Sequence, residues 1–169
     1  MKKIYLLIMA LCCVCTVFCQ DITGLWKGIM YNDSTHQQFD YEMVIRRENG
    51  KLSGYSHTWF LINEKKYYGV KKLKVKIARD GKIIVEDAEL IANNYPVSIN
   101  KYVRQLNVLD MLTREGQIIL DGAFVTNRTK EFMELTGHIN VKRENELSKS
   151  DLLDFLQKSS LDNILTIAK

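Results

Sequence analysis

Few residues in this 169-residue sequence have the types and the spacing that catalysis requires. Its histidines, His36, His57 and His138, stand far apart in the chain. A serine triad needs a base beside a nucleophile and an orienting acid, and the sequence has no Gly-x-Ser-x-Gly elbow, His-Glu-x-x-His pair or phosphate-binding glycine loop. It therefore predicts no catalytic residue, no metal site and no cofactor, and we expect the protein not to be an enzyme. A pair of carboxylates that hydrolyses glycosides is the alternative that the sequence leaves open.

Aromatic side chains give a better indication of a binding site. Tyr55, His57 and Trp59 alternate along one stretch, so in a strand they share one face, while Leu52 and small residues share the other. If Leu52 points into the core, the aromatic row stands on the outer wall and offers a contact surface for a partner, a glycan or the C-terminal helix. With the opposite parity, the row lines a cavity together with Tyr41 and binds a small ligand. Ordinary packing is the third interpretation of these four candidate residues.

The elements that must position these residues are β-strands. Apolar and polar residues alternate with a period of two at residues 39–46, 72–77 and 133–142, which is typical of strands with one buried face. Weaker runs of similar length lie at residues 22–32, 51–61, 82–92, 101–112 and 117–126, and turn residues separate many of them. Eight strands with short turns predict an all-β fold, an antiparallel up-and-down barrel whose closure removes exposed edges.

A row of lysines follows one of these strands. Lys72, Lys74 and Lys76 share a face, and a meander would place the acidic stretch that contains Asp87 (residues 86–89) on the next strand. Carboxylates opposite the ammonium groups would cancel the positive patch. We therefore expect a solvated, paired outer face here, with Asp87 among the partners.

The first nineteen residues predict a signal peptide. Two lysines precede an apolar run, residues 4–18, that is too short to span a bilayer, and small residues stand three and one positions before a cut at Gln20. All four cysteines lie in this leader, so the exported chain has no thiol for a disulfide or a metal site. Phe18 before Cys19 disfavours lipid anchoring through that cysteine. We expect export to the periplasm or to the cell exterior.

The rest of the chain is expected to form one domain. Removing residues 1–19 takes the 169 residues to 150 and the formal charge from +4 to +2, which predicts no nucleic-acid partner. The barrel should occupy residues 20–145. In the tail, residues 146–169, Ser148 and Asp151 form a variant of the capping box before an apolar stripe, which predicts an amphipathic helix packed on the barrel. We expect no transmembrane span after the leader.

The first strand opens with a motif that resembles a known group of barrels. Residues 21–28, Asp-Ile-Thr-Gly-Leu-Trp-Lys-Gly, resemble the Gly-x-Trp opening of the calycin group, which comprises lipocalins, fatty-acid-binding proteins and avidins. Residues 50–55, Gly-Lys-Leu-Ser-Gly-Tyr, resemble the hairpin into the third strand of avidin-like and bacterial lipocalin-like domains. The resemblance implies a secreted barrel in which Gly24 and Trp26 close one end beneath a basic side chain of the last strand, and Arg143 is suitably placed for that role.

The resemblance does not extend to a particular ligand. Lys27 and Gly28 follow Trp26 where avidins have a nearby asparagine, and Trp59 is the only other tryptophan. The disulfide and the Thr-Asp-Tyr-like motif of secreted lipocalins are also absent from the sequence after the leader. Biotin binding is therefore not implied.

Together these features predict an exported, non-catalytic, lipocalin-like module that binds a small apolar or aromatic ligand or a glycan. The alternative is a structural or protein-interaction domain of the cell envelope, with a filled interior and no ligand. An eight-stranded outer-membrane barrel would also alternate apolar and polar residues, but with its apolar face toward lipid. The charged linker and amphipathic helix, in place of a final strand with a terminal aromatic, argue against that architecture.

Overall fold

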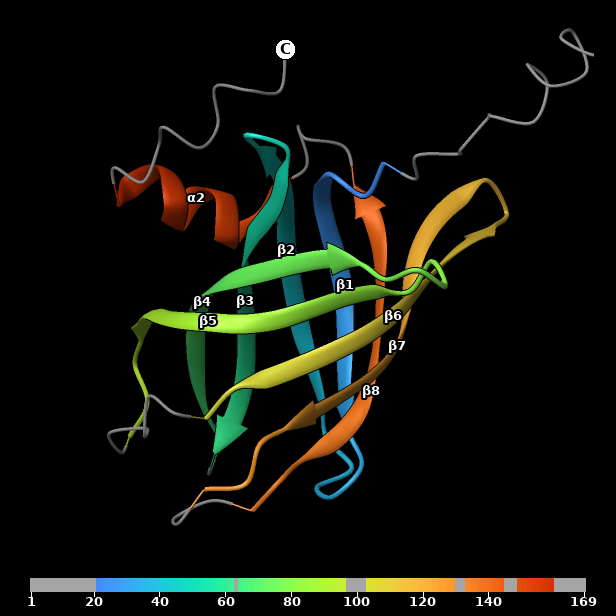
Figure 1. The fold of residues 1–169 in the computed structure, drawn as a ribbon. Helices are drawn as coiled ribbons and strands as arrows, with labels where there is room; N and C mark the ends of the chain where they lie inside the picture. Colours follow the sequence, from blue (N-terminus) through green and yellow to red (C-terminus); the bar gives the residue numbers. More distant parts are fainter. Residues whose placement is uncertain (1–20, 63, 97–102, 130–132, 145–148, 160–169) are drawn as a thin grey trace, which may run out of the picture.

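The computed structural model describes residues 21–62, 64–96, 103–129, 133–144 and 149–159, and the predicted leader lies outside them. Within these residues eight strands form one closed barrel, in which each strand pairs antiparallel with the next and the last pairs with the first (Figure 1). The strands are β1 (Gly24–Asn32), β2 (Gln38–Glu48), β3 (Lys51–Ile62), β4 (Lys65–Ile77), β5 (Ile83–Asn93), β6 (Gln105–Arg114), β7 (Gln117–Thr126) and β8 (Thr136–Glu144), and the helix α2 (Asp151–Lys158) follows. The predicted fold class, an up-and-down barrel with a C-terminal helix, is confirmed.

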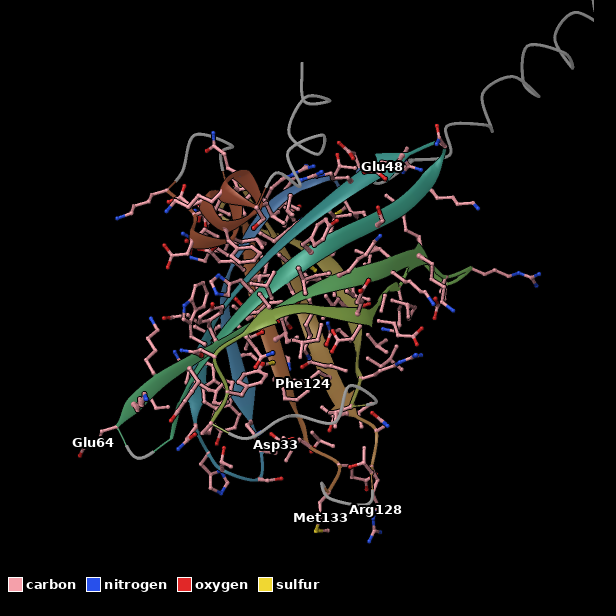
Figure 2. All side chains as sticks on the ribbon, turned by 90° about the vertical axis from the view of Figure 1, so that its left-hand side faces the viewer. Asp33, Glu48, Glu64, Phe124, Arg128 and Met133 are labelled. Carbon is pink, nitrogen blue, oxygen red and sulfur yellow. The ribbon has the colours of Figure 1, made fainter. Side chains whose placement is uncertain are left out.

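The two ends of the barrel have different connections. At one end, which we call the plugged end, short hairpins join β2 to β3, β4 to β5 and β6 to β7, and the chain enters β1. At the other, the loop end, lie the connections from β1 to β2, β3 to β4, β5 to β6 and β7 to β8. Figure 2 shows Glu48 at the plugged end and Asp33, Glu64 and Met133 at the loop end.

Two hairpins at the plugged end are fixed by their turn residues. Asn49 and Gly50 have φ values of 50° and 76°, and Glu115 and Gly116 have values of 51° and 77°. Two-residue turns of type I′ need positive φ at both central positions, which glycine adopts without strain and which matches the twist of the flanking strands. The register of β2 with β3 and of β6 with β7 follows from these turns.

The apolar core lies inside the barrel, as the alternation predicts. Along β5, Ile83 and Val85 are fully buried while Ile84 between them is partly exposed, and β8 shows the same alternation. The buried core includes Trp26, Met43, Ile45, Leu73, Val75, Ile83, Val85, Leu109, Leu120, Ile139 and Val141. Side chains of the outer faces are left for solvent, for ion pairs and for α2.

Several strand boundaries differ from the prediction by a few residues, and those of β8 and β4 are the most informative. β8 begins at Thr136 rather than at residue 133, and Met133 is 72% exposed. β4 begins at Lys65 and so includes a segment that shows no alternation. The reason is that both faces of this segment are covered: Tyr67 and Val70 lie on opposite faces of the strand and both are buried.

The predicted helix packs on the outer wall, where Figure 1 shows it beside β3 and β2. It begins after Ser150, whose hydroxyl accepts the Leu153 N–H at 3.2 Å. The N-cap is therefore Ser150 and not Ser148, which lies outside the described residues. Leu152 and Leu156 are fully buried against the wall. In the described part of the chain, no helix is long and apolar enough to cross a membrane.

Candidate functional site

Trp26 and Arg143 lie together at the plugged end. The Trp26 side chain is fully buried, and its indole N–H donates to the Ile22 carbonyl at 3.0 Å. The Arg143 guanidinium lies over the indole ring, 5.6 Å from its centroid, and donates to the Thr23 carbonyl. A Cβ atom at Gly24 would stand 3.4 Å from Arg143 Nε, and Gly24 has a φ of 122° that side chains disfavour. The structure thus brings together the three residues to which the resemblance assigns barrel closure.

The aromatic row of β3 faces outward. Met43 belongs to the inner core and pairs with Ser56, so the neighbours of Ser56 along the strand point out of the barrel. Tyr55 packs against the apolar cluster that α2 forms with the wall. The rings of His57 and Trp59 lie 3.8 Å apart between centroids. Part of this row therefore serves as the floor on which α2 rests.

A buried carboxylate on the outer wall holds α2 in place. Glu42 is 5% exposed and accepts hydrogen bonds from the Ser150 hydroxyl at 2.7 Å and from the Leu152 N–H at 2.9 Å. Lys27 Nζ pairs with the other carboxylate oxygen at 2.8 Å. An anion at a helix N-terminus binds free N–H groups and interacts favourably with the helix dipole. Glu42 therefore fixes the start of α2 above the aromatic row.

His57 is buried on the outer wall, where its imidazole makes ring contacts but no hydrogen bonds among the described residues. It is 6% exposed, and neither ring nitrogen has a hydrogen-bond partner among the described residues. Its ring stands between Trp59 and Tyr68, with the Tyr68 centroid 5.4 Å away. Burial lowers the pKa of His57, although the carboxylates of Glu42 and Asp151 act in the opposite direction. The imidazole is therefore neutral at physiological pH.

Tyr41 does not belong to the aromatic row. It pairs with Thr58 in the register, lies in the inner core and is 2% exposed. Of the candidate binding residues, Tyr41 lies inside the barrel and Tyr55, His57 and Trp59 lie outside it, so they do not form one site.

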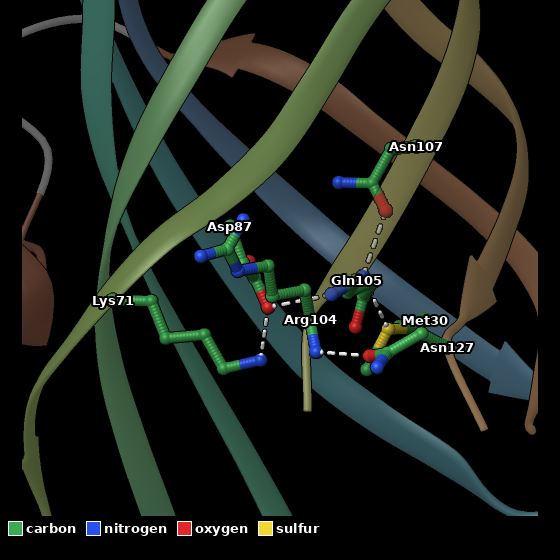
Figure 3. Close-up of polar contacts among 7 residues, drawn as sticks. All are labelled: Met30, Lys71, Asp87, Arg104, Gln105, Asn107 and Asn127. Carbon is green, nitrogen blue, oxygen red and sulfur yellow. Dashed lines mark hydrogen bonds and ion pairs between the residues drawn. The ribbon is translucent and has the colours of Figure 1, made fainter. Parts of the chain in front are cut away.

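Polar side chains of β4, β5 and β6 gather at one place in the barrel (Figure 3), and two of them, Asp87 and Asn107, lie close enough to Tyr41 to act on its pKa. Asp87 pairs with Leu73 in the register, points inward and is 6% exposed. It forms an ion pair with Lys71, and its Oδ2 accepts the backbone N–H of Gln105 at 2.9 Å. This contact continues the seam between β5 and β6, whose register pairs run only from Ile83↔Leu109 to Glu86↔Leu106. Beyond Glu86, a hydrogen bond from the Gln105 backbone to the Asp87 side chain thus takes the place of backbone pairing between β5 and β6.

Asn107 is the most deeply buried member of this polar network, with 1% exposure. Its Oδ1 accepts from Gln105 Nε2 at 2.8 Å, and its Nδ2 has no hydrogen-bond partner among the described residues. Figure 3 shows this nitrogen pointing away from Gln105. An unsatisfied buried donor costs about 1–3 kcal/mol, so it is an unusual group in a barrel interior.

The Tyr41 phenol stays protonated in this environment. Burial and the nearby Asp87 carboxylate raise its pKa, and the polar side chains of Ser56 and Asn107 close to the phenol offset this only in part. The Asn107 side chain thus lies near the Tyr41 hydroxyl, although its Nδ2 forms no hydrogen bond of full geometry with the described residues. The interior therefore presents two donors, a phenol and an amide, side by side.

Aromatic rings form a cluster at the loop end, and Asp87 of the polar network acts on one of them, Tyr95. The Phe60 ring lies 5.9 Å from Tyr67, 5.1 Å from Tyr95 and 6.3 Å from Phe39 between centroids. Gly69 makes room for Tyr95, because a Cβ atom there would stand 2.0 Å from the Tyr95 hydroxyl oxygen. Burial, with a smaller contribution from the Asp87 carboxylate, raises the pKa of Tyr95 to about 12.

The prediction that Asp87 faces outward, opposite the lysine row, was wrong. Lys74 pairs with Glu86 and Lys72 pairs with Glu89, but the register shifts between Lys72 and Leu73 and leaves Asp87 on the inner face. There Asp87 forms an ion pair with Lys71, a residue that was not predicted to belong to a site.

The sequence does contain a signal that could have identified Asp87, Gln105 and Asn107 as interior residues. Asp87 continues the parity of Ile83 and Val85, and Gln105 and Asn107 share the parity of buried Leu109. A polar residue at a position that the alternation assigns to the core is the feature that marks this site.

Comparison with known proteins gives no guide to the function of this chain. A scan against protein-family models found no match for this chain, and a search of curated proteins found no related sequence. The part of the chain that the structure describes has no group of three or more His, Cys, Asp or Glu side chains that could hold a metal ion. The closed eight-stranded barrel resembles folds that bind ligands. Which ligand it could bind, and where, has to be argued from the side chains inside the barrel and on its wall.

Proposed function

We propose that this protein is an exported, lipocalin-like binding protein that holds a small ligand inside the loop end of its barrel and catalyses no reaction. The observation that carries the proposal is the buried polar network of Asp87, Gln105 and Asn107. An interior that served stability alone would be filled with apolar side chains, because buried polar groups without partners are costly. Apolar core residues, Met30 and Phe124 among them, lie beside the network, so polar side chains interrupt the apolar filling here.

The surroundings of the network suit a small ligand. Binding sites for small molecules are lined mainly by apolar and aromatic side chains, with a few polar groups that set orientation. At the loop end Phe60, Tyr67 and Tyr95 supply the aromatic lining and Asn107 supplies a polar group. Trp26 and Arg143 close the opposite end, so the ligand enters through the loop end.

The outer aromatic row gives weaker support to a protein-interaction role. Tyr55 and His57 lie beneath α2, and Glu42 anchors that helix through the hydrogen bonds to Ser150 and Leu152. A partner that used the row would have to displace α2 or to bind at its edge.

Native mass spectrometry of the protein, purified without denaturation from its own host, tests this proposal. We expect an additional mass that denaturation releases. Phe60→Ala, on the inner face of β3, should lose the retained mass because it removes the central ring of the aromatic lining. Trp59→Ala, its neighbour on the outer face, is the matched control and should retain it.

Retention that is lost in Trp59→Ala but kept in Phe60→Ala would place the ligand on the outer wall and contradict the proposal. Absence of any retained mass, together with co-purification of one stoichiometric protein partner, would favour the structural or interaction domain instead.

A further inference from the structure

The charges inside the loop end are already balanced. Asp87 and Lys71 form an ion pair whose side chains are 8% and 20% exposed, and Asp87 also accepts the Gln105 N–H. Taking a charge out of water is expensive unless a free partner awaits it. A charged ligand would find both of these ions engaged, so the network favours a ligand with no net charge.

The hydrogen-bonding capacity that remains is that of a donor. The Asn107 carbonyl oxygen is occupied by Gln105 Nε2, and the amide nitrogen is free among the described residues. Gln105 Nε2 also lies 3.5 Å from Met30 Sδ, a weak acceptor, which is consistent with Gln105 as the donor in this amide pair. The adjacent Tyr41 phenol is protonated and can donate as well. A ligand that satisfies this site must bring an acceptor atom.

The surrounding rings limit the shape of the ligand. Phe60 and Tyr67 are stacked at an interplanar angle of 28°, and Tyr95 is tilted by 38° from Phe60. Aromatic faces arranged in this way favour flat, apolar molecules, which gain from offset stacking. A flexible polar chain would leave this lining without complementary contacts.

We infer that the ligand is an uncharged, flat, mainly apolar molecule whose carbonyl oxygen, or an equivalent acceptor atom, takes the free N–H of Asn107. The inference rests on the proposed function, since it describes what the same interior would bind. Within that function Asn107 is the specificity-determining residue, and the aromatic rings supply general affinity.

Three naphthalene probes of nearly equal size separate these contributions in a fluorescence titration of the purified, ligand-free protein. They are 2-acetylnaphthalene, which has a carbonyl acceptor, 2-ethylnaphthalene, which has none, and 2-naphthoate, which is an anion. We expect the ketone to bind about tenfold more tightly than the hydrocarbon, as one satisfied buried donor implies, and the anion to bind most weakly. In Asn107→Leu the ketone should fall to the affinity of the hydrocarbon, whose own affinity stays unchanged.

Asn140→Leu, on the outer face of β8, is the control and should keep the preference for the ketone. The inference is wrong if Asn107→Leu keeps that preference, if 2-naphthoate binds as tightly as the ketone, or if none of the probes binds. It is also wrong if the molecule released from native protein is ionised at neutral pH. In each of these cases a ligand retained in native mass spectrometry would leave the proposed function standing, so the two failures are distinguishable.

Discussion

The two ends of the barrel differ in whether their buried polar groups have hydrogen-bond partners. At the plugged end the indole N–H of Trp26 donates to a carbonyl, and Arg143 covers the ring while donating to another. At the loop end Asn107 is just as deeply buried, but its amide nitrogen has no partner among the described residues. The first end is completed by the chain itself. The second retains an unused donor, and this difference is why we place the ligand there.

The largest effect is expected from Trp26→Ala. This change removes a fully buried indole that packs in the inner core and whose N–H is satisfied. Truncating a buried tryptophan costs about 3–5 kcal/mol, because apolar contacts are lost and a cavity remains. The free energy of unfolding, measured with a chemical denaturant, should fall by that amount.

Trp59→Ala is the control for this experiment, because Trp59 lies on the outer wall and is only partly buried. Its loss of stability should be clearly smaller. Equal losses in the two variants would mean that Trp26 does not close the barrel as the structure indicates.

A smaller loss is expected from Arg143→Met at the same end. The methionine keeps part of the apolar contact with Trp26 but loses the cation–π interaction and the hydrogen bond to Thr23. Interactions of this kind contribute about 1–2 kcal/mol together, since the guanidinium is partly exposed. Lys142→Met, one residue earlier and on the outer face, should leave the free energy of unfolding nearly unchanged. A similar loss in both variants would show a general effect of removing charge from β8.

The opposite sign is expected at the loop end. In the double variant Gln105→Leu/Asn107→Leu, apolar side chains replace an amide pair that includes an unsatisfied donor. Replacing both partners of a buried hydrogen bond by apolar groups of similar shape is neutral or stabilising, here by about 1 kcal/mol. The ligand-free protein should therefore unfold at the same or at a higher denaturant concentration. A marked loss of stability would indicate that the network is structural, and would remove the contrast with the plugged end.

Most of the fold could be predicted from two-residue periodicity. That signal depends on one buried and one solvated face, which holds for most of β8 and for parts of β5 and β7. It failed at the start of β4, because Tyr67 is buried inside and Val70 is buried beneath α2. Where both faces are covered, the sequence no longer alternates, and the extent of the strand becomes visible only when its neighbours are known.

The candidate site could be predicted only in part. Tyr41 was named, but with residues of the outer row, since parity cannot tell the inner face from the outer one before the pairing of Met43 with Ser56 is known. Asp87 was misplaced for a different reason. Its charge suggested solvent, whereas its parity with Val85 placed it inside, and its partner Lys71 becomes adjacent only through strand pairing.

His57 on the outer wall resembles Asn107 in the interior. It is buried, and its two ring nitrogens have no hydrogen-bond partner among the described residues. Burial lowers its pKa below the ordinary value of 6.5, and Lys66 acts in the same direction, while Glu42 and Asp151 act against them. A base with a lowered pKa binds protons more readily in the unfolded or undocked state. The stability it contributes is therefore fully present above about pH 6.5 and is lost as the pH falls through that value toward the lower pKa of the folded state.

This is the smallest effect that we expect, because the nearby carboxylates offset part of the cost of burying the imidazolium. Between neutral pH and about pH 5, hydrogen exchange of the α2 amides should become faster than that of the inner strands. His57→Phe keeps an aromatic ring between Trp59 and Tyr68 but cannot be protonated, so its α2 amides should lose this extra acceleration. If the acid response of α2 persists in His57→Phe, the His57 imidazole does not control the docking of α2, and the free polar atoms of the outer wall do not behave like those of the interior.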